Sequence, residues 1–238
     1  MISPPRYGGI DGCRAGWVCL TSDFVSPPTV SVYTTFADLL KATRSYHRIA
    51  IDIPIGLLAE ARPGGRTCDA EARKILGRGR CSSVFSPPCR AAVYTGDYRE
   101  ALRLNRESSD HQLGISKQVF NISDKIREVD ELMTPKLQTR IREVHPEMAF
   151  LRLNDAMDLP SKKLPEGALA REEILARYGL TDLRQLLLAY RRSEVLLDDL
   201  LDAAMACVVA RMIGERQARR CPQKPELDDR GLKMEINY

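Results

Sequence analysis

The sequence predicts an α/β fold: a mixed five-stranded sheet with its first three strands antiparallel, flanked by helices, and with a helical insertion after the fourth strand. The opening segment alternates short β-branched stretches with turns and ends on a nearly continuous apolar run, which is typical of a buried parallel strand. The last third of the chain has apolar residues at helical spacing. We therefore expect one domain over residues 1–238, with residues 54–139 as a helical and loop insertion.

Three short segments near the start of the chain have the composition of strands. Tyr7–Asp11 contains two glycines, which permit another backbone to approach closely. Gly16–Leu20 and Thr29–Thr34 are rich in β-branched residues and partly alternate in polarity. Pro27 and Pro28 mark a turn between the second and third segments. Because the connections are short, we expect these three strands to pair antiparallel.

Two further strands are expected after the first helix. Phe36–Arg44 has apolar residues at helical spacing, and Arg48–Ile53 is a nearly continuous apolar run that Pro54 ends. Such a run predicts a buried central strand, parallel to the first strand. Ile141–His145, closed by Pro146, is the candidate for the fifth strand.

The insertion differs in character from the rest of the chain. Its loops are rich in Gly, Pro and Arg, and its helical patches are Cys68–Leu76, Tyr98–Arg106 and Ser116–Met133. Few of its residues are large and apolar, which favours an insertion over the end of the sheet and not a separate domain.

Three helices are expected in the last third of the chain, at Glu166–Tyr178, Leu183–Tyr190 and Ser193–Ile213. Ser193 is the expected N-cap of the third helix, because a serine hydroxyl accepts a hydrogen bond from the first turn. Ala203–Ala210 is apolar on all sides, which predicts burial of this helix. Leu232–Tyr238 forms a short closing segment.

Composition excludes several classes of protein. Hydrophobic residues make up 44% of the chain and charged residues 29%, which is ordinary for a globular protein with a core. No apolar run approaches the roughly 20 residues of a membrane span, and no signal-peptide pattern is present, so we expect a cytoplasmic protein. The 7 cysteines include no Cys-x-x-Cys pair, which argues against structural zinc. A net charge of +4 is compatible with a nucleic-acid partner or with a solvated basic face. Nothing specifies an oligomeric state.

Acidic residues occur where several predicted elements end or begin. Asp11 ends the first strand, Asp52 lies within the most apolar strand, and Glu143 flanks the fifth strand. Asp199 and Asp202 are three positions apart at the start of the buried helix, so they share one helical edge. If the first and fourth strands are neighbours, the carboxylates of Asp11 and Asp52 lie side by side.

Carboxylates held that close repel one another, and the usual remedies are a shared proton, an arginine or a bound cation. Hard oxygen ligands suit Mg²⁺ or Mn²⁺. Two such ions about 3.5–4 Å apart can activate a water and stabilise the leaving oxygen of a phosphodiester. We therefore expect Mg²⁺ or Mn²⁺ at Asp11, Asp52, Asp199 and Asp202, with Glu143 as a further catalytic candidate.

Each acid also has an alternative interpretation. Asp11 could cap a turn, because Asp is common before Gly, and Asp52 could pair with an arginine of the insertion. Asp198, Asp199 and Asp202 could be first-turn acids that favour the helix dipole. Glu143 could form surface ion pairs with the arginines beside it.

A series of short motifs runs in order along nearly the whole chain: Gly9–Trp17, Ile51–Leu57, Cys68–Arg73, Arg80–Pro88, Gly114–Gln118, Glu143–Glu147, Asp199–Ala203 and Gly231–Ile236. In this order they resemble a family of uncharacterised bacterial and archaeal proteins described as predicted ribonuclease-H-like nucleases. That family is related at superfamily level to Holliday-junction resolvases.

The resemblance implies the ribonuclease-H-like fold, with the first-strand acid at Asp11, the fourth-strand acid at Asp52 and the late-helix acids at Asp199 and Asp202. It implies a divalent-metal-dependent nuclease that hydrolyses phosphodiester bonds of DNA or RNA. Two alternatives remain open. One is a non-catalytic nucleic-acid-binding or interaction module with this fold. The other is a nucleotide-binding relative of the actin-like ATPases, whose first phosphate loop resembles Asp11–Val18.

Several polar side chains are suited to contact with a phosphate: Arg14, Arg73, Arg80, Ser82, Ser83, Lys117, Gln118 and His145. The alternative is that Ser82 and Ser83 cap a turn and that the arginines pair with Asp69 or Glu71. His145 could be a proton shuttle or a buried, hydrogen-bonded imidazole.

Overall fold

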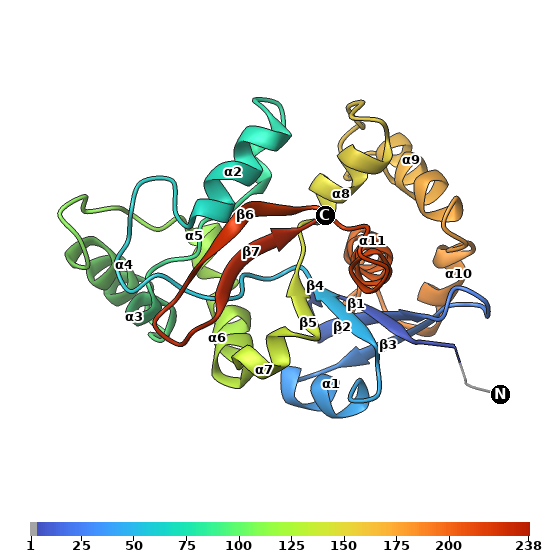
Figure 1. Cartoon of the computed structure of the whole chain (residues 1–238), viewed down its shortest axis with the longest axis horizontal. Coiled ribbons are helices and arrows are strands. Elements are labelled where there is room, and N and C mark those ends of the chain that lie inside the picture. The colour runs from blue at the N-terminus through green and yellow to red at the C-terminus, as the bar shows by residue number, and fades with distance from the viewer. Residues whose placement is uncertain (1–3) are drawn as a thin grey trace. The chain divides into compact units, whose positions relative to one another are not determined.

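The computed structural model describes residues 4–238, which form two compact units by their contacts (Figure 1). The sheet unit comprises the residues up to Asp52 together with Arg140–Arg219 and Asn237–Tyr238. The insertion unit comprises Ile53–Thr139 and Arg220–Ile236. The insertion unit contains most of the predicted insertion 54–139 and, in addition, most of the C-terminal hairpin.

The sheet unit contains a mixed 5-stranded sheet in the order β3-β2-β1-β4-β5. Its strands are β1 (Tyr7–Cys13), β2 (Gly16–Ser22), β3 (Thr29–Tyr33), β4 (Arg48–Ile51) and β5 (Ile141–Glu143). The strands β1, β2 and β3 pair antiparallel, whereas β4 is parallel to β1 and β5 is parallel to β4. This confirms the predicted mixed α/β fold with a five-stranded sheet flanked by helices.

The helices of the sheet unit are α1 (Phe36–Ala42), α8 (Pro146–Leu153), α9 (Pro165–Ala176), α10 (Leu183–Leu186) and α11 (Leu197–Gly214). Helix α8 is not predicted by the sequence analysis. The prediction that Ser193 caps α11 is wrong, because the helix begins at Leu197 and Leu196 is its N-cap. No side chain among the described residues caps the first-turn N–H groups of α11; the backbone N–H of Leu196 donates to Oδ2 of Asp199 at 2.9 Å.

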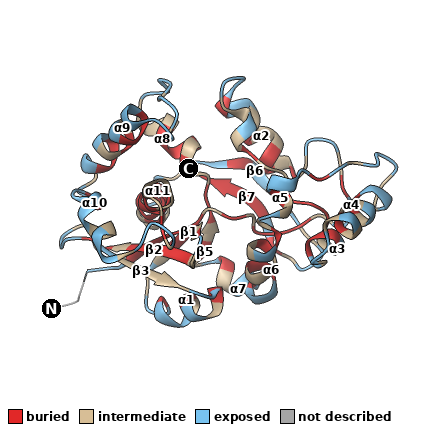
Figure 2. Ribbon diagram, turned by 180° about the vertical axis from the view of Figure 1, so that it is seen from behind, coloured by how far each residue is buried: buried red, intermediate tan, exposed pale blue. Residues whose placement is uncertain are grey.

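The buried helix α11 packs directly on β1, and Gly9 makes this possible. A Cβ atom at Gly9 would lie 2.0 Å from the backbone oxygen of Ala203 and 2.0 Å from the backbone nitrogen of Cys207. Only glycine leaves room for this contact. Most of α11 and the central strands are buried (Figure 2), as the apolar run Ala203–Ala210 predicts.

The helices of the insertion unit are α2 (Thr67–Leu76), α3 (Arg90–Val93), α4 (Tyr98–Glu107), α5 (Lys117–Phe120), α6 (Ser123–Leu132) and α7 (Pro135–Gln138). Its two strands are β6 (Arg220–Leu227) and β7 (Lys233–Asn237). The last residue of β7, Asn237, belongs to the sheet unit. The helix expected over Ser116–Met133 is divided into α5 and α6, and β6 is not predicted.

Buried ion pairs in the insertion unit accompany its buried apolar residues. Arg66 and Asp69 are fully buried and their side chains are 2.7 Å apart. Arg90 pairs with Asp130 and, at 2.5 Å, with Asp228. Removing one partner of such a pair typically costs about 3–5 kcal/mol. A count of large apolar residues therefore understates how far this segment can form a compact unit of its own.

Across residues 4–238, none of the helices combines the length and the apolarity that a passage through a membrane requires.

Candidate functional site

Asp11 and Asp52 lie next to each other at one edge of the sheet. Ile10 of β1 is in register with Ile51 of β4, and the N–H of Asp52 donates to the carbonyl of Ile10 at 2.9 Å. Side chains alternate between the two faces of a sheet. Asp11 is therefore on the same face as Gly9, which is the face covered by α11, and Asp52 is on that face too.

Asp199 and Asp202, in the first turns of α11, lie near Asp11. Asp202 is almost completely buried, with 3% of its surface exposed, and Asp199 is partly buried. The charges of Asp52, Asp202 and Asp199 all act on Asp11. The other three predicted metal ligands, Asp52, Asp199 and Asp202, thus lie within electrostatic range of Asp11.

Lys162 also belongs to this group, and the sequence analysis does not identify it. It lies between α8 and α9, in a segment without helix or strand. Its Nζ atom forms an ion pair with Oδ2 of Asp202 and interacts electrostatically with Asp11 and Asp52. No periodic pattern marks a lysine in an irregular segment, so its position could be found only from the structure. We call these five residues the carboxylate cluster.

Burial and mutual repulsion favour protonation of the acids in the cluster. Burial, followed by the charges of Asp52 and Asp202, raises the pKa of Asp11 well above its usual range. Burial and the charge of Asp202 do the same to the pKa of Asp52. The pKa of Asp202 is raised by burial, although Lys162 partly offsets this. Burial and nearby charges raise the pKa of Asp199 to about 6.

The ammonium group of Lys162 is the positive counterpart of these carboxylates. Burial lowers the pKa of Lys162, but the charges of Asp202, Asp11 and Asp52 outweigh this effect and raise it. Within residues 4–238, no arginine forms an ion pair with Asp11 or Asp52. When all four acids are ionised, one lysine cannot balance their charge.

The chemistry of these donors fits Mg²⁺ or Mn²⁺, which prefer carboxylate oxygens. Oδ1 of Asp202 is buried and accepts no hydrogen bond from the residues that the structure describes. The positions of the described side chains, in contrast, do not form a site for an ion. No group of three or more His, Cys, Asp or Glu side chains within residues 4–238 is placed to hold one ion. Three acceptor atoms are already used. Oδ2 of Asp202 pairs with Lys162, Oδ2 of Asp199 accepts from the N–H of Leu196, and Oδ1 of Asp11 accepts from the N–H of Gly12 at 2.7 Å.

Glu143 lies at the end of β5, next to this sheet edge, and its charge helps to raise the pKa of Asp52. It is in register with Ile51 of β4, whereas Asp52 is the next residue along. Glu143 is buried, with 4% of its surface exposed. Glu147, two helical positions into α8, accepts two hydrogen bonds from NH2 of Arg171, at 2.8 and 2.9 Å. His145 is the N-cap residue of α8.

The predicted phosphate contacts differ in their availability. Arg14 is exposed in the turn between β1 and β2, and Lys117 and Gln118 are exposed on α5. Arg73 is used internally, because its guanidinium donates to the carbonyl oxygens of Val84 at 3.2 Å and Gly64 at 2.8 Å.

The segment around Ser82 forms a local turn. The hydroxyl of Ser83 donates to the carbonyl of Arg80 at 2.8 Å, as in the alternative interpretation, in which this serine caps a turn. Ser82 is exposed and Arg80 is partly buried.

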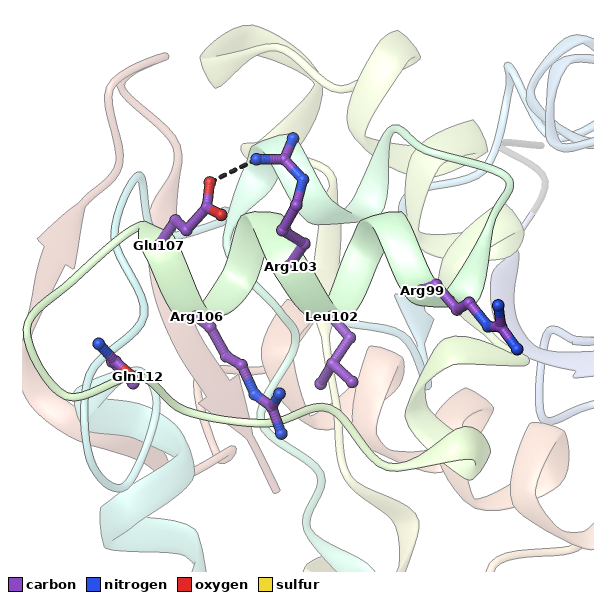
Figure 3. Close-up of a pocket in the computed structure, with 6 residues that line it drawn as sticks. All are labelled: Arg99, Leu102, Arg103, Arg106, Glu107 and Gln112. Atoms are coloured by element: carbon purple, nitrogen blue, oxygen red, sulfur yellow. Dashed lines mark hydrogen bonds and ion pairs between the residues drawn. The ribbon is translucent and has the colours of Figure 1, made fainter.

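A surface pocket of the insertion unit has a basic lining that the sequence analysis does not single out. Its volume is about 420 Å³, and Figure 3 shows the residues that line it: Arg99, Leu102, Arg103, Arg106, Glu107 and Gln112. Arg103 pairs with Glu107 and with Glu100 of the preceding turn. Arg99 and Arg106 are exposed and form no ion pair with the residues that the structure describes.

Comparison with curated proteins and with solved structures finds no match for this chain. One family profile matches residues 9–227, which include the acids of the cluster, Lys162 and most of the insertion unit. The chain belongs to the family described as "Protein of unknown function (DUF429)".

Proposed function

We propose that this protein is a divalent-metal-dependent nuclease that hydrolyses phosphodiester bonds of a nucleic acid. The observation that carries the proposal is the carboxylate cluster, in which the charges of Asp52 and Asp202 act on Asp11 and a single ammonium group pairs with Asp202. Strained, mutually repelling acids of this kind are typical of functional sites, because a protein gains no stability from them.

The placement of the acids supports a ribonuclease-H-like fold for the sheet unit. The first three strands are antiparallel, the fourth is parallel to the first, and the acids come from the end of β1, the residue after β4 and the start of the last long helix. This is the distribution of acids that the family resemblance implies at Asp11, Asp52, Asp199 and Asp202.

Asp11, Asp52 and Asp202 would hold the ion, with Asp199 at the edge of the cluster. A bound Mg²⁺ or Mn²⁺ would polarise a phosphoryl oxygen and lower the pKa of a coordinated water. The sheet and α11 keep these carboxylates in a poorly hydrated environment, where electrostatic interactions are strong. Asp199 remains oriented by its hydrogen bond from Leu196.

The basic pocket supports a polyanionic substrate. Arg99 and Arg106 are seven positions apart on α4, which is about 10 Å along a helix. Guanidinium groups bind phosphate oxygens with two parallel hydrogen bonds. Because these two guanidinium groups form no ion pair with the described residues, binding a phosphate would not break an existing one.

The direct test is a cleavage assay with Mn²⁺ or Mg²⁺ on single-stranded, duplex, hybrid and branched nucleic acids. We expect cleavage by the unmodified protein and loss of at least about 100-fold in rate for Asp11→Asn, because ligand carboxylates contribute several kcal/mol to such reactions. Asp124→Asn is the matched control, since its side chain is 75% exposed on α6. A protein inert on all four substrates with either ion would refute the proposal.

A second candidate is a nucleic-acid-binding module without turnover. It is favoured by the arrangement of the acids, in which no three ligands within residues 4–238 are placed to hold one ion. Salt-dependent binding with no cleavage, and no effect of Asp11→Asn on affinity, would identify this function.

A further inference from the structure

Lys162 occupies the position in the cluster where a cation is needed. Its ammonium group pairs with Oδ2 of Asp202, whose side chain is only 4% exposed, and the lysine side chain itself is 33% exposed. The same ammonium group acts electrostatically on Asp11 and Asp52. A lysine carries one compact charge at the end of a flexible stem, so it can enter a narrow acidic site and leave it again.

The ion pair uses one of the two carboxylate oxygens with which Asp202 could hold a metal. A divalent cation held by Asp202 needs one or both of its carboxylate oxygens. Oδ1 accepts no hydrogen bond from the described residues, but Oδ2 is used by Lys162. A doubly charged ion and an ammonium group on one carboxylate also repel each other strongly in a buried site.

We propose that Lys162 is an internal counter-cation, which a divalent ion must displace from Asp202 before the cluster binds that ion. The inference rests on the proposed function, because it assumes that the cluster binds a metal. The displacement accounts for the arrangement of the acids. They lie near one another, but no three of the described side chains surround a single ion position. In the protein without metal, the ammonium group of Lys162 balances part of the negative charge that a bound ion would otherwise balance.

The local structure allows the side chain to leave while the backbone stays in place. Arg171 donates to the carbonyl oxygen of Pro160 at 2.9 Å, and Arg171 is 1% exposed. Gly167 of α9 lies against the next residue, because a Cβ atom there would be 2.0 Å from the carbonyl oxygen of Ser161. The backbone before Lys162 is therefore anchored to α9, and rotation of the lysine stem suffices for the displacement.

The test compares Mn²⁺ binding by calorimetry in the unmodified protein, in Lys162→Met and in Lys163→Met. Methionine keeps most of the lysine stem but removes the competing charge. We expect the dissociation constant for Mn²⁺ to fall at least about tenfold in Lys162→Met, because binding no longer requires the ammonium to leave. Lys163 is exposed and adjacent in sequence, so Lys163→Met should bind Mn²⁺ as the unmodified protein does.

A second measurement needs no substitution and remains decisive if Lys162→Met does not fold. The unmodified protein is acetylated briefly with and without Mn²⁺, and the modification of Lys162 relative to Lys163 is measured by mass spectrometry. An ammonium group in an ion pair reacts slowly, so we expect Mn²⁺ to raise the relative reactivity of Lys162 several-fold.

The outcomes separate this inference from the proposed function. Equal Mn²⁺ affinity in Lys162→Met and the unmodified protein, with binding lost in Asp52→Asn, would overturn the displacement and leave the metal site intact. Unchanged acetylation of Lys162 at saturating Mn²⁺ would overturn it as well. If neither protein binds Mn²⁺, the inference and the metal-dependent function both fail.

Discussion

Replacing Asp199 with asparagine tests whether the cluster is strained in the protein without metal. The pKa of Asp199 is raised from 3.8 to about 6, chiefly by burial, so the folded protein holds a proton on this group that the unfolded chain has released. The folded state then binds more protons between these two values, and its stability must fall as the pH rises through this range. Above about pH 6 the ionised group costs the folded state free energy.

The size of this cost follows from the pKa. At about 1.4 kcal/mol per pH unit, a rise from 3.8 to about 6 corresponds to about 3 kcal/mol as an upper limit. Asp199 is only partly buried, and solvent screening reduces the value to about 1–2 kcal/mol. The oxygen of asparagine can still accept the hydrogen bond from Leu196, so most of the helix cap is retained.

We therefore expect Asp199→Asn to be more stable than the unmodified protein by about 1 kcal/mol at pH 7.5, and about equally stable at pH 3.5. Urea unfolding followed by circular dichroism in the presence of EDTA measures both values. A variant that is less stable at pH 7.5 by more than about 1 kcal/mol would show that Asp199 acts mainly as a helix cap and that the cluster is not strained at this position.

Two further predictions concern the packing of the site and its substrate. Gly9→Ala should destabilise the protein by about 3 kcal/mol or more, because a Cβ atom there meets the backbone of α11 at 2.0 Å. Chemical denaturation measures this loss. Gly96→Ala should show no comparable loss, because no atom lies within 4 Å of a Cβ atom at Gly96. The double substitution Arg99→Gln with Arg106→Gln should weaken binding of single-stranded nucleic acid and reduce the slope of log affinity against log salt by about 1.4. Fluorescence anisotropy at several salt concentrations measures this slope. Arg184→Gln removes a charge from α10, and an equal reduction of the slope in this variant would contradict a specific role for the pocket.

The meeting of Asp11 and Asp52 could be predicted from the sequence because it depends on strands. An apolar run closed by proline marks β4, and the two glycines of β1 mark a close approach. Once β1 and β4 are parallel neighbours, residues at corresponding positions lie side by side. Asp199 and Asp202 follow from the length and apolarity of α11, although the predicted helix start was four residues too early.

The remaining parts of the site depend on contacts that leave no local pattern. Lys162 reaches the cluster from an irregular segment between α8 and α9. The compactness of the insertion unit depends on buried pairs such as Arg66 with Asp69. These residues are close in sequence, but nothing in the sequence distinguishes a buried pair from the surface ion pairs common on helices.

The measurement that tests the central claim most directly is a crystal structure of the protein soaked in Mn²⁺, with anomalous diffraction to locate the ion. We predict an anomalous peak about 2.0–2.6 Å from carboxylate oxygens of both Asp11 and Asp52, with the Lys162 ammonium withdrawn from Asp202. A cluster without anomalous density, in which Lys162 still pairs with Asp202, would contradict the assignment of these acids as a metal site.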